Sequence, residues 1–360
     1  MDTRNIQKVL LLFLLIYVFL VSIQLMGASF KLFGKDFAEL LITTTSDPLA
    51  GLFIGIVATS IIQSSSTTTS IVVGLVAVGG LSLENAIPII MGANIGTTVT
   101  NTIVSIMHVT RKQEFERAFA ASVVHDFFNI MAVLVLFPLE MTTHVLEKSA
   151  TLLSDAFVGA GGMKFIGPLD YLVKPAVKFV AGLTGGSPIT MFVLSLIMLF
   201  LALKFMVDIT RSLMMTQFEV MIDRYLFKNA PTAFVLGIML TILVQSSSVT
   251  TSIIIPLVGA GILTVRKIFP YTLGSNIGTT VTAMMAALIT LNPAAVTVAF
   301  THLLFNIFGV VLIYPFREIP IRLAIGFAKI VAKSKKHAFV FLFIYFALHI
   351  IPLIFILAFK

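Results

Sequence analysis

The sequence predicts an all-α polytopic membrane protein made of two inverted-topology repeats, each with a re-entrant helical hairpin. Three observations support this class. First, 58% of the residues are hydrophobic, only 11% are charged and mean hydropathy is +1.07, which leaves too few polar side chains to cover a soluble domain. Second, residues 63–100 return at 245–282 without a gap, and 21 of these 38 positions are identical. Third, equivalent loops of the two copies differ in charge, as inverted repeats do.

Apolar stretches of about 20 residues, the length that crosses a bilayer, define the expected spanning helices. These stretches are residues 6–26, 86–107, 118–139, 188–207, 268–290, 294–314 and 338–359. The apolar segments beside each Ser run are only about 14 residues long, too short to cross singly. They are residues 49–62, 67–81, 232–244 and 249–263. Each pair forms either one broken span or a hairpin that enters and leaves on the same side.

Loop charges favour the hairpin, because Lys and Arg concentrate on the cytoplasmic side of a membrane protein. With the basic N-terminus inside, the first helix carries the chain out, and Glu84 also falls on the outer side. Segment 49–81 has therefore returned to the side from which it entered. In the second copy, Arg266 and Lys267 fall inside, so segment 232–264 behaves in the same way with its sides reversed.

These spans and loops predict four regions. They are a first repeat at 1–140 containing hairpin 49–81, an extracytoplasmic connector at 141–187, a second repeat at 188–317 containing hairpin 232–264, and a cytoplasmic amphipathic helix with a C-terminal span at 318–360. The expected location is the inner (plasma) membrane, crossed many times, with the N-terminus in the cytoplasm.

Other classes of function receive little support. Cysteine is absent and the six histidines form no HExxH or similar ligand spacing. The net charge of +8 lies in short loops between apolar spans rather than on one soluble face, so no nucleic-acid partner is expected. An intramembrane enzyme would use Ser64 or Ser246 with a base, and His125 is the one midspan candidate. No GxSxG motif accompanies them, so we expect no enzyme.

The Ser-rich tips of the two hairpins carry the chemistry that we expect to bind substrate. A helix begins near Thr67 and near Val249, so free N–H groups and the positive end of each helix dipole point into the site. The preceding half-helix ends there with free carbonyls, which suit a hard cation such as Na⁺. This favours an anion carried together with cations. The candidate anion-binding residues are Gln63, Ser64, Ser65, Ser66, Gln245, Ser246, Ser247 and Ser248.

A second duplicated motif follows each tip at the same distance, Gly92-Ala93-Asn94-Ile95-Gly96-Thr97-Thr98 in the first copy and Gly274-Ser275-Asn276-Ile277-Gly278-Thr279-Thr280 in the second. An isolated Ser run or a glycine in a membrane helix often serves only helix packing. Because the Ser runs occur in two copies in register, each with this second motif, a role in helix packing alone is less favoured for them. The motif glycines are interpreted as packing residues. Asn94 and Asn276 need partners at mid-span, because an amide in the bilayer is costly when it is unpaired.

Asp126 is the one carboxylate deep in an expected span, which makes it a candidate cation or proton site. Its counterpart in the second repeat is Leu303, so the pseudo-symmetry is broken at the charge. His125 reads as a packing histidine or a site residue. Asn129 and Asn306 lie one turn beyond Asp126 and Leu303 on the same helix faces.

These motifs resemble the type II sodium-phosphate cotransporter family, bacterial branch. The likeness rests on QSSSTTTSIVVGLV, PIIMGANIGTTVTNTIV and FERAFAASVVHDFFN in the first half, and on VQSSSVTTSIIIPLVGAG, LGSNIGTTVTA and FTHLLFNIFG in the second. It implies a sodium-coupled symporter of inorganic phosphate, with both tips meeting at the substrate. Asp126 falls where electrogenic members carry an acid and electroneutral members a glycine. His108 and Arg111 depart from the Gln and Asp of animal relatives.

The expected function is therefore secondary active, sodium-coupled uptake of inorganic phosphate, made electrogenic by Asp126. Na⁺ is the co-transported ion and no organic cofactor is expected. The candidate Na⁺-site residues, in part carried over from the family, are Asn94, Thr97, Thr98, Asp126, Asn129, Ser275, Asn276, Thr279, Thr280, Thr282 and Asn306. A passive anion channel and a sodium symporter for another small oxyanion are the alternatives. The oligomeric state is left open, a homodimer included.

Overall fold

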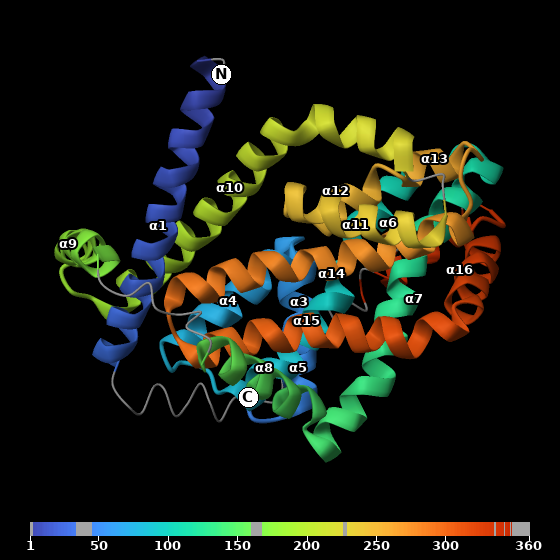
Figure 1. Ribbon diagram of the computed structural model, residues 1–360. Coiled ribbons are helices and arrows are strands. Elements are labelled where there is room, and N and C mark those ends of the chain that lie inside the picture. The colour runs from blue at the N-terminus through green and yellow to red at the C-terminus, as the bar shows by residue number, and fades with distance from the viewer. Residues whose placement is uncertain are drawn as a thin grey trace.

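The computed structural model describes residues 3–33, 45–159, 168–225 and 229–347, except 335, 342 and 346. Within these residues the chain is helical, with turns and no strand. The helices are α1 Thr3–Phe33, α3 Pro48–Ile62, α4 Ser65–Ala77, α5 Leu83–Gly96, α6 Val99–Ile106, α7 Lys112–Thr143, α8 Val145–Gly159, α9 Pro168–Leu183, α10 Pro188–Tyr225, α11 Ala230–Val244, α12 Ser247–Ser252, α13 Ile255–Gly259, α14 Val265–Thr290, α15 Pro293–Ile313, η1 Tyr314–Phe316 and α16 Glu318–Val331 (Figure 1).

Within the described residues, six apolar helical stretches are long enough to cross a bilayer, which confirms an all-α polytopic membrane protein. They are Ile6–Ser29, Leu83–Ile106, Lys112–Thr143, Pro188–Met206, Val265–Thr290 and Pro293–Phe316, the first six of the seven expected spans. The part of the expected C-terminal region that lies beyond residue 347, which includes the end of the seventh span 338–359, lies outside the described residues.

The helix boundaries repeat at the offset of 182 residues. α3 and α11 correspond in both their first and last residues, and α4 begins at Ser65 where α12 begins at Ser247. The match has a local cause, because each start carries an equivalent polar cap. Ser64 accepts the N–H of Thr67, and Ser246 accepts the N–H of Val249.

Two helices that we expected to be continuous are broken. In the expected segment 249–263, α12 ends at Ser252 and α13 begins at Ile255, because Pro256 has no N–H and its ring crowds the carbonyl four residues back. The counterpart of Pro256 is Gly74, and α4 runs without interruption. The expected span 86–107 is likewise interrupted between α5 and α6.

Glycines let α3 lie directly against α5, and α11 directly against α14. A Cβ on Gly92 of α5 would overlap the Leu52 carbonyl oxygen of α3. A Cβ on Gly274 of α14 would overlap the Phe234 carbonyl oxygen of α11 in the same way. The glycines of the second motif are thus packing residues, as the sequence indicated.

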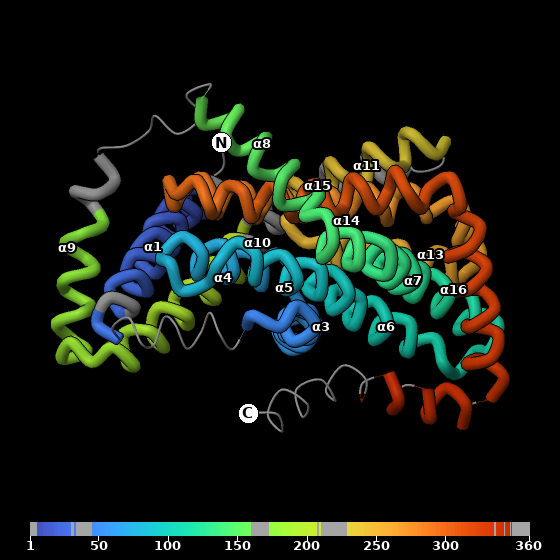
Figure 2. Tube along the Cα trace, turned by 90° about the horizontal axis from the view of Figure 1, so that it is seen from below, coloured from blue at the N-terminus to red at the C-terminus, as the bar shows by residue number. Residues whose placement is uncertain are grey.

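The remaining helices pack beside the helix pairs α3–α4 and α11–α12. α1 and α10, which begin the two copies, pack side by side at one end of the molecule, and α16 lies at the other end (Figures 1 and 2). The expected connector 141–187 forms α8 and α9 in its described part. α8 packs on α15, where the Ser154 hydroxyl donates to the Pro293 carbonyl at 3.3 Å, and α9 packs on α1.

α16 is joined to the start of α14 by an ion pair. The Arg266 guanidinium donates to both Glu318 carboxylate oxygens, at 3.1 and 2.8 Å. These bonds hold the pKa of Glu318 below its ordinary range. Arg322, which lies 3.5 Å from the same Glu318 carboxylate, and Lys329 are exposed on α16, as basic residues of an amphipathic helix on a membrane surface would be.

Candidate functional site

The two QSSS tips have the same backbone geometry. Gln63 and Gln245 end the first legs in the left-handed region, with φ of 61° and 56°. The serine that follows each Gln is extended and caps the second leg, with φ of −151° and −150°. Left-handed backbone at a non-glycine residue costs about 1 kcal/mol or more, and such strain is typical of functional sites. The same strained turn at both tips indicates that this backbone conformation is needed for function.

This turn leaves hydrogen-bond donors at both tips. The first N–H groups of a helix have no carbonyl within their own helix. At the tips these are the N–H groups of Ser65 and Ser66 and of Ser247 and Ser248, whose side chains are buried. Gln63 and Gln245 are only partly buried. Each tip therefore offers a group of neutral hydrogen-bond donors at a helix N-terminus, where anions are commonly bound.

The beginning of α6 contacts both tips. The Thr100 hydroxyl donates to Gln63 Oε1 at 3.0 Å, which joins α6 to the first tip. One residue later, Asn101 Nδ2 donates to the Thr251 hydroxyl of α12 at 2.9 Å. The second tip also reaches the break itself, where Ser248 Oγ donates to the Thr97 carbonyl at 3.3 Å. Residues 97–101 thus connect the tips of the two copies.

Sequence reasoning did not single out Thr100, Asn101 or Thr251. A signal was present at Asn101, the first position after the duplicated block, where the second copy carries Ala283. The structural consequence is an asymmetry between the copies. Thr251 is bonded to Asn101, whereas its counterpart Thr69 is fully buried and its hydroxyl has no partner among the described residues.

Asparagines join the two second motifs through α7. Asn129 Nδ2 donates to the Asn94 carbonyl at 2.7 Å, and Asn276 Nδ2 donates to Asn129 Oδ1 at 2.9 Å. All three side chains are at most 2% exposed. The structure therefore brings together three of the predicted Na⁺-site residues, one from each of α5, α7 and α14.

Asp126 lies in a different environment, at an apolar cavity of about 380 Å³. It is hydrogen-bonded to the Thr98 hydroxyl beside the α5–α6 break, and the Tyr345 hydroxyl is 3.5 Å from the same oxygen. Its other oxygen, Oδ2, has no hydrogen-bond partner in the described part of the chain. Phe127 and Phe341 are among the apolar residues that line the cavity.

The other predicted Na⁺-site residues are buried on their helices. The hydroxyls of Thr97, Thr279 and Thr280 each donate to a carbonyl of their own helix turn. Thr282 is buried on α14, and the Asn306 amide donates to the His302 carbonyl on α15. Within the described residues, no hydrogen bond brings Asn306 to Asp126.

A duplicated sequence with polar side chains inside buried helices defines a polytopic membrane protein with an internal sequence repeat. The chain belongs to the Na⁺/Pi-cotransporter family, which it matches at residues 18–167 and 198–352.

Three curated relatives illustrate the likeness. The chain is 33% identical over 449 residues to sodium-dependent phosphate transport protein 2B of Pongo abelii and to the protein of the same name of Homo sapiens, covering 97% of this chain and 65% of each. It is 34% identical over 428 residues to sodium-dependent phosphate transport protein 2A of Ovis aries, covering 95% of this chain and 66% of that protein. The chain thus spans about two thirds of the length of these relatives. No solved structure matches it.

Proposed function

We propose that this chain is a secondary active transporter that couples Na⁺ entry to the uptake of inorganic phosphate, which binds between the two QSSS tips. The observation that carries the proposal is the bridge at the start of α6, where Thr100 bonds to Gln63 and Asn101 bonds to Thr251. Because one short segment touches both tips, a single ligand can be shared by both copies. The names of the relatives, sodium-dependent phosphate transport proteins, supply the substrate and the ion.

Phosphate suits the donors that the tips present. The N–H groups of the first turns of α4 and α12 and the serine hydroxyls around them can surround an oxyanion. The residues of both tips, 63–66 and 245–248, include no Lys or Arg. Neutral donors bind an anion moderately, which suits a carrier because a carrier must also release its substrate.

Na⁺ suits the buried oxygens nearby. Within the described residues, the fully buried side-chain oxygens of the predicted Na⁺ set that lack a hydrogen-bond partner are Asp126 Oδ2, Ser275 Oγ and Asn306 Oδ1. An unpaired polar atom buried in a membrane protein is costly, and a hard cation with oxygen ligands would remove that cost. We assign the electrogenic Na⁺ to Asp126, because it is the one charged member of the set.

The proposed arrangement in the membrane follows from the loop charges. The two copies run in opposite directions, hairpins 49–81 and 232–264 are re-entrant, and their tips meet near the midplane. The N-terminus is cytoplasmic and the membrane is the plasma membrane. Transport would then move the tip-containing helices against α1 and α10, which pair at the edge of the molecule.

Uptake by the purified protein in proteoliposomes tests this function. An inward Na⁺ gradient should drive labelled phosphate above its outside concentration, with an inward positive current, and an equal K⁺ gradient should not. Phosphate uptake that is independent of the Na⁺ gradient would overturn the proposal. Phosphate flux that only equilibrates indicates a passive channel, and sulfate accumulation without phosphate accumulation indicates another oxyanion.

The same assay with Asp126→Gly tests the charge assignment. The variant should carry about one elementary charge less per phosphate, because the Na⁺ held by this carboxylate loses its anionic ligand. Ser122→Ala is the matched control, since Ser122 lies one turn before Asp126 on α7, its hydroxyl donates to the Phe119 carbonyl of its own helix, and it is not among the predicted Na⁺-site residues. An unchanged charge-to-phosphate ratio in Asp126→Gly would reject the role of Asp126.

A further inference from the structure

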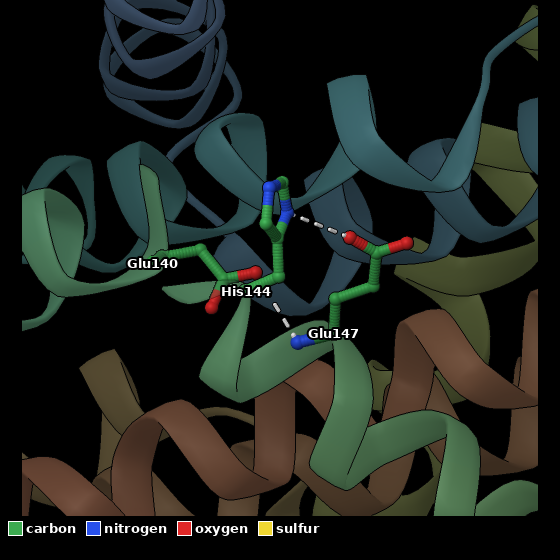
Figure 3. A group of neighbouring side chains, drawn as sticks. All are labelled: Glu140, His144 and Glu147. Carbon is green, nitrogen blue, oxygen red and sulfur yellow. Dashed lines mark hydrogen bonds and ion pairs between the residues drawn. The ribbon is translucent and has the colours of Figure 1, made fainter. Parts of the chain in front are cut away.

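We propose that the corner between α7 and α8 binds a divalent transition-metal ion through Glu140, His144 and Glu147. The three side chains gather where α7 ends and α8 begins (Figure 3). One ligand atom from each residue lies within 4.8 Å of the others. This cluster is separate from the tips and from the predicted Na⁺ residues. Its spacing, Glu-x3-His-x2-Glu, differs from the HExxH spacing of a common zinc motif.

Glu140 is held in place as a metal ligand needs to be. Its side chain is buried, 1% exposed, although it is a carboxylate. Oε2 accepts the N–H of Leu146 at 2.6 Å, and Oε1 accepts the N–H of Glu147 at 3.2 Å. Each carboxylate oxygen keeps a further lone pair, so the bonds that cap α8 also fix the carboxylate orientation toward an ion.

His144 is positioned by an unusual backbone. It ends α7 in the left-handed region, with φ of 54°, where a non-glycine residue is strained. Its Nδ1 is 3.1 Å from Glu147 Oε2. Two ligand atoms that share a zinc ion with bonds of about 2.1 Å lie roughly 3.0–3.4 Å apart. The imidazole and the Glu147 carboxylate therefore already have the spacing of a ligand pair.

The charges around the corner between α7 and α8 favour the binding of a cation. Glu140 and Glu147 have no ion pair with Lys or Arg among the described residues, and the nearby Lys148 ammonium donates to the Thr143 carbonyl instead. His144 also lines a cavity of about 280 Å³ whose wall includes the Glu84 carboxylate. This cavity gives an ion a negatively lined approach to the imidazole.

The donor set selects the class of ion. One imidazole nitrogen and two carboxylate oxygens suit Zn²⁺ and the similar divalent ions Ni²⁺ and Co²⁺, with water in the remaining position. Ca²⁺ prefers six to eight oxygen ligands and no nitrogen, so it should bind poorly here.

Zinc titration of the purified full-length chain in detergent, followed by calorimetry, tests the proposal. Wild type should bind one Zn²⁺ at this site, and Ca²⁺ should not compete. His144→Asn and Glu147→Gln should each weaken binding at least tenfold. The Asn variant is chosen because Asn tolerates the left-handed region, so the helix end is kept. His337→Ala is the matched control, since His337 is an exposed histidine bonded to Ser334, and its affinity should stay within twofold.

Thermal unfolding supplies a second readout. Saturating Zn²⁺ should raise the melting temperature of wild type and of His337→Ala but not that of His144→Asn. Equal zinc affinity in His144→Asn and His337→Ala would overturn the proposal, as would wild type that binds no zinc. In those cases Glu140 serves only to cap α8, and His144 and Glu147 form only an ion pair.

Discussion

Replacing Gly274 with valine is expected to abolish the folded protein. The first added carbon would overlap the Phe234 carbonyl oxygen of α11, so two helices in backbone contact would have to separate. Because backbone cannot rotate away as a side chain can, the cost should exceed about 3 kcal/mol, the upper range for overpacked cores. Gly92→Val should fail equally, since Gly92 meets the Leu52 carbonyl of α3 in the same way.

Size-exclusion chromatography and thermal unfolding in detergent measure this outcome. Gly326→Val is the matched control, because Gly326 is also helical but a Cβ there meets nothing within 4 Å. It should remain monodisperse with a melting temperature near that of wild type. A monodisperse Gly274→Val protein with wild-type stability would contradict the packing described for α11 and α14.

Replacing Asn101 with alanine, or Thr251 with valine, is expected to raise the phosphate KM about tenfold, equivalent to about 1.4 kcal/mol. Either change removes the hydrogen bonds between these two side chains, which fix the second tip against α6. A looser tip must be ordered when the substrate binds, and that ordering lowers affinity. Maximal uptake should fall less, because the donors of the tip remain.

The pseudo-symmetry of the chain provides the control for this prediction. Thr69→Val changes the counterpart of Thr251, whose hydroxyl has no partner in the described structure, and should alter KM less than twofold. The double variant Asn101→Ala/Thr251→Val should have the same phosphate KM as either single variant, because both single changes remove the same interaction. A Thr69→Val effect as large as that of Thr251→Val would show that the bridge has no special role.

Much of the fold could be predicted from the sequence because its signals are local. The length of each apolar stretch identified six spans. The helices after the tips were expected to begin near Thr67 and Val249, and they begin two residues earlier, at Ser65 and Ser247, because the preceding serines cap them through their own hydroxyls. The glycines at 92 and 274 were interpreted correctly as packing positions, since membrane helices approach closely where side chains are small.

The two helix breaks, between α12 and α13 and between α5 and α6, were not predicted from the sequence. Pro256 carried a usable signal, a proline inside the second leg of a hairpin, and it was missed because the first copy has Gly74 there. The break between α5 and α6 had no such signal. The counterpart of its Thr97–Thr98 pair, Thr279–Thr280, lies within the unbroken helix α14. The difference lies in tertiary contacts, where Thr98 bonds to Asp126 and Ser248 bonds to the Thr97 carbonyl.

The sequence indicated which residues could form the candidate site but not which of them are in contact. Asn94 and Asn276 were expected to need partners, and the structure links both of them to Asn129. Asn101 was not expected, because its partner Thr251 is 150 residues away and lies in the other copy. The cluster at His144 was not expected either, since the turn at the end of α7 brings its members together.

Disulfide cross-linking between positions 101 and 251 tests most directly whether both copies build one polar site. The chain has no cysteine, so Asn101→Cys/Thr251→Cys would carry the only two thiols. Their side chains are in hydrogen-bond contact, and we expect mild oxidation of membranes to join them, as seen by mass spectrometry of unreduced peptides. If both thiols react with a maleimide but do not join to each other, the two tips do not share a site and the account is wrong.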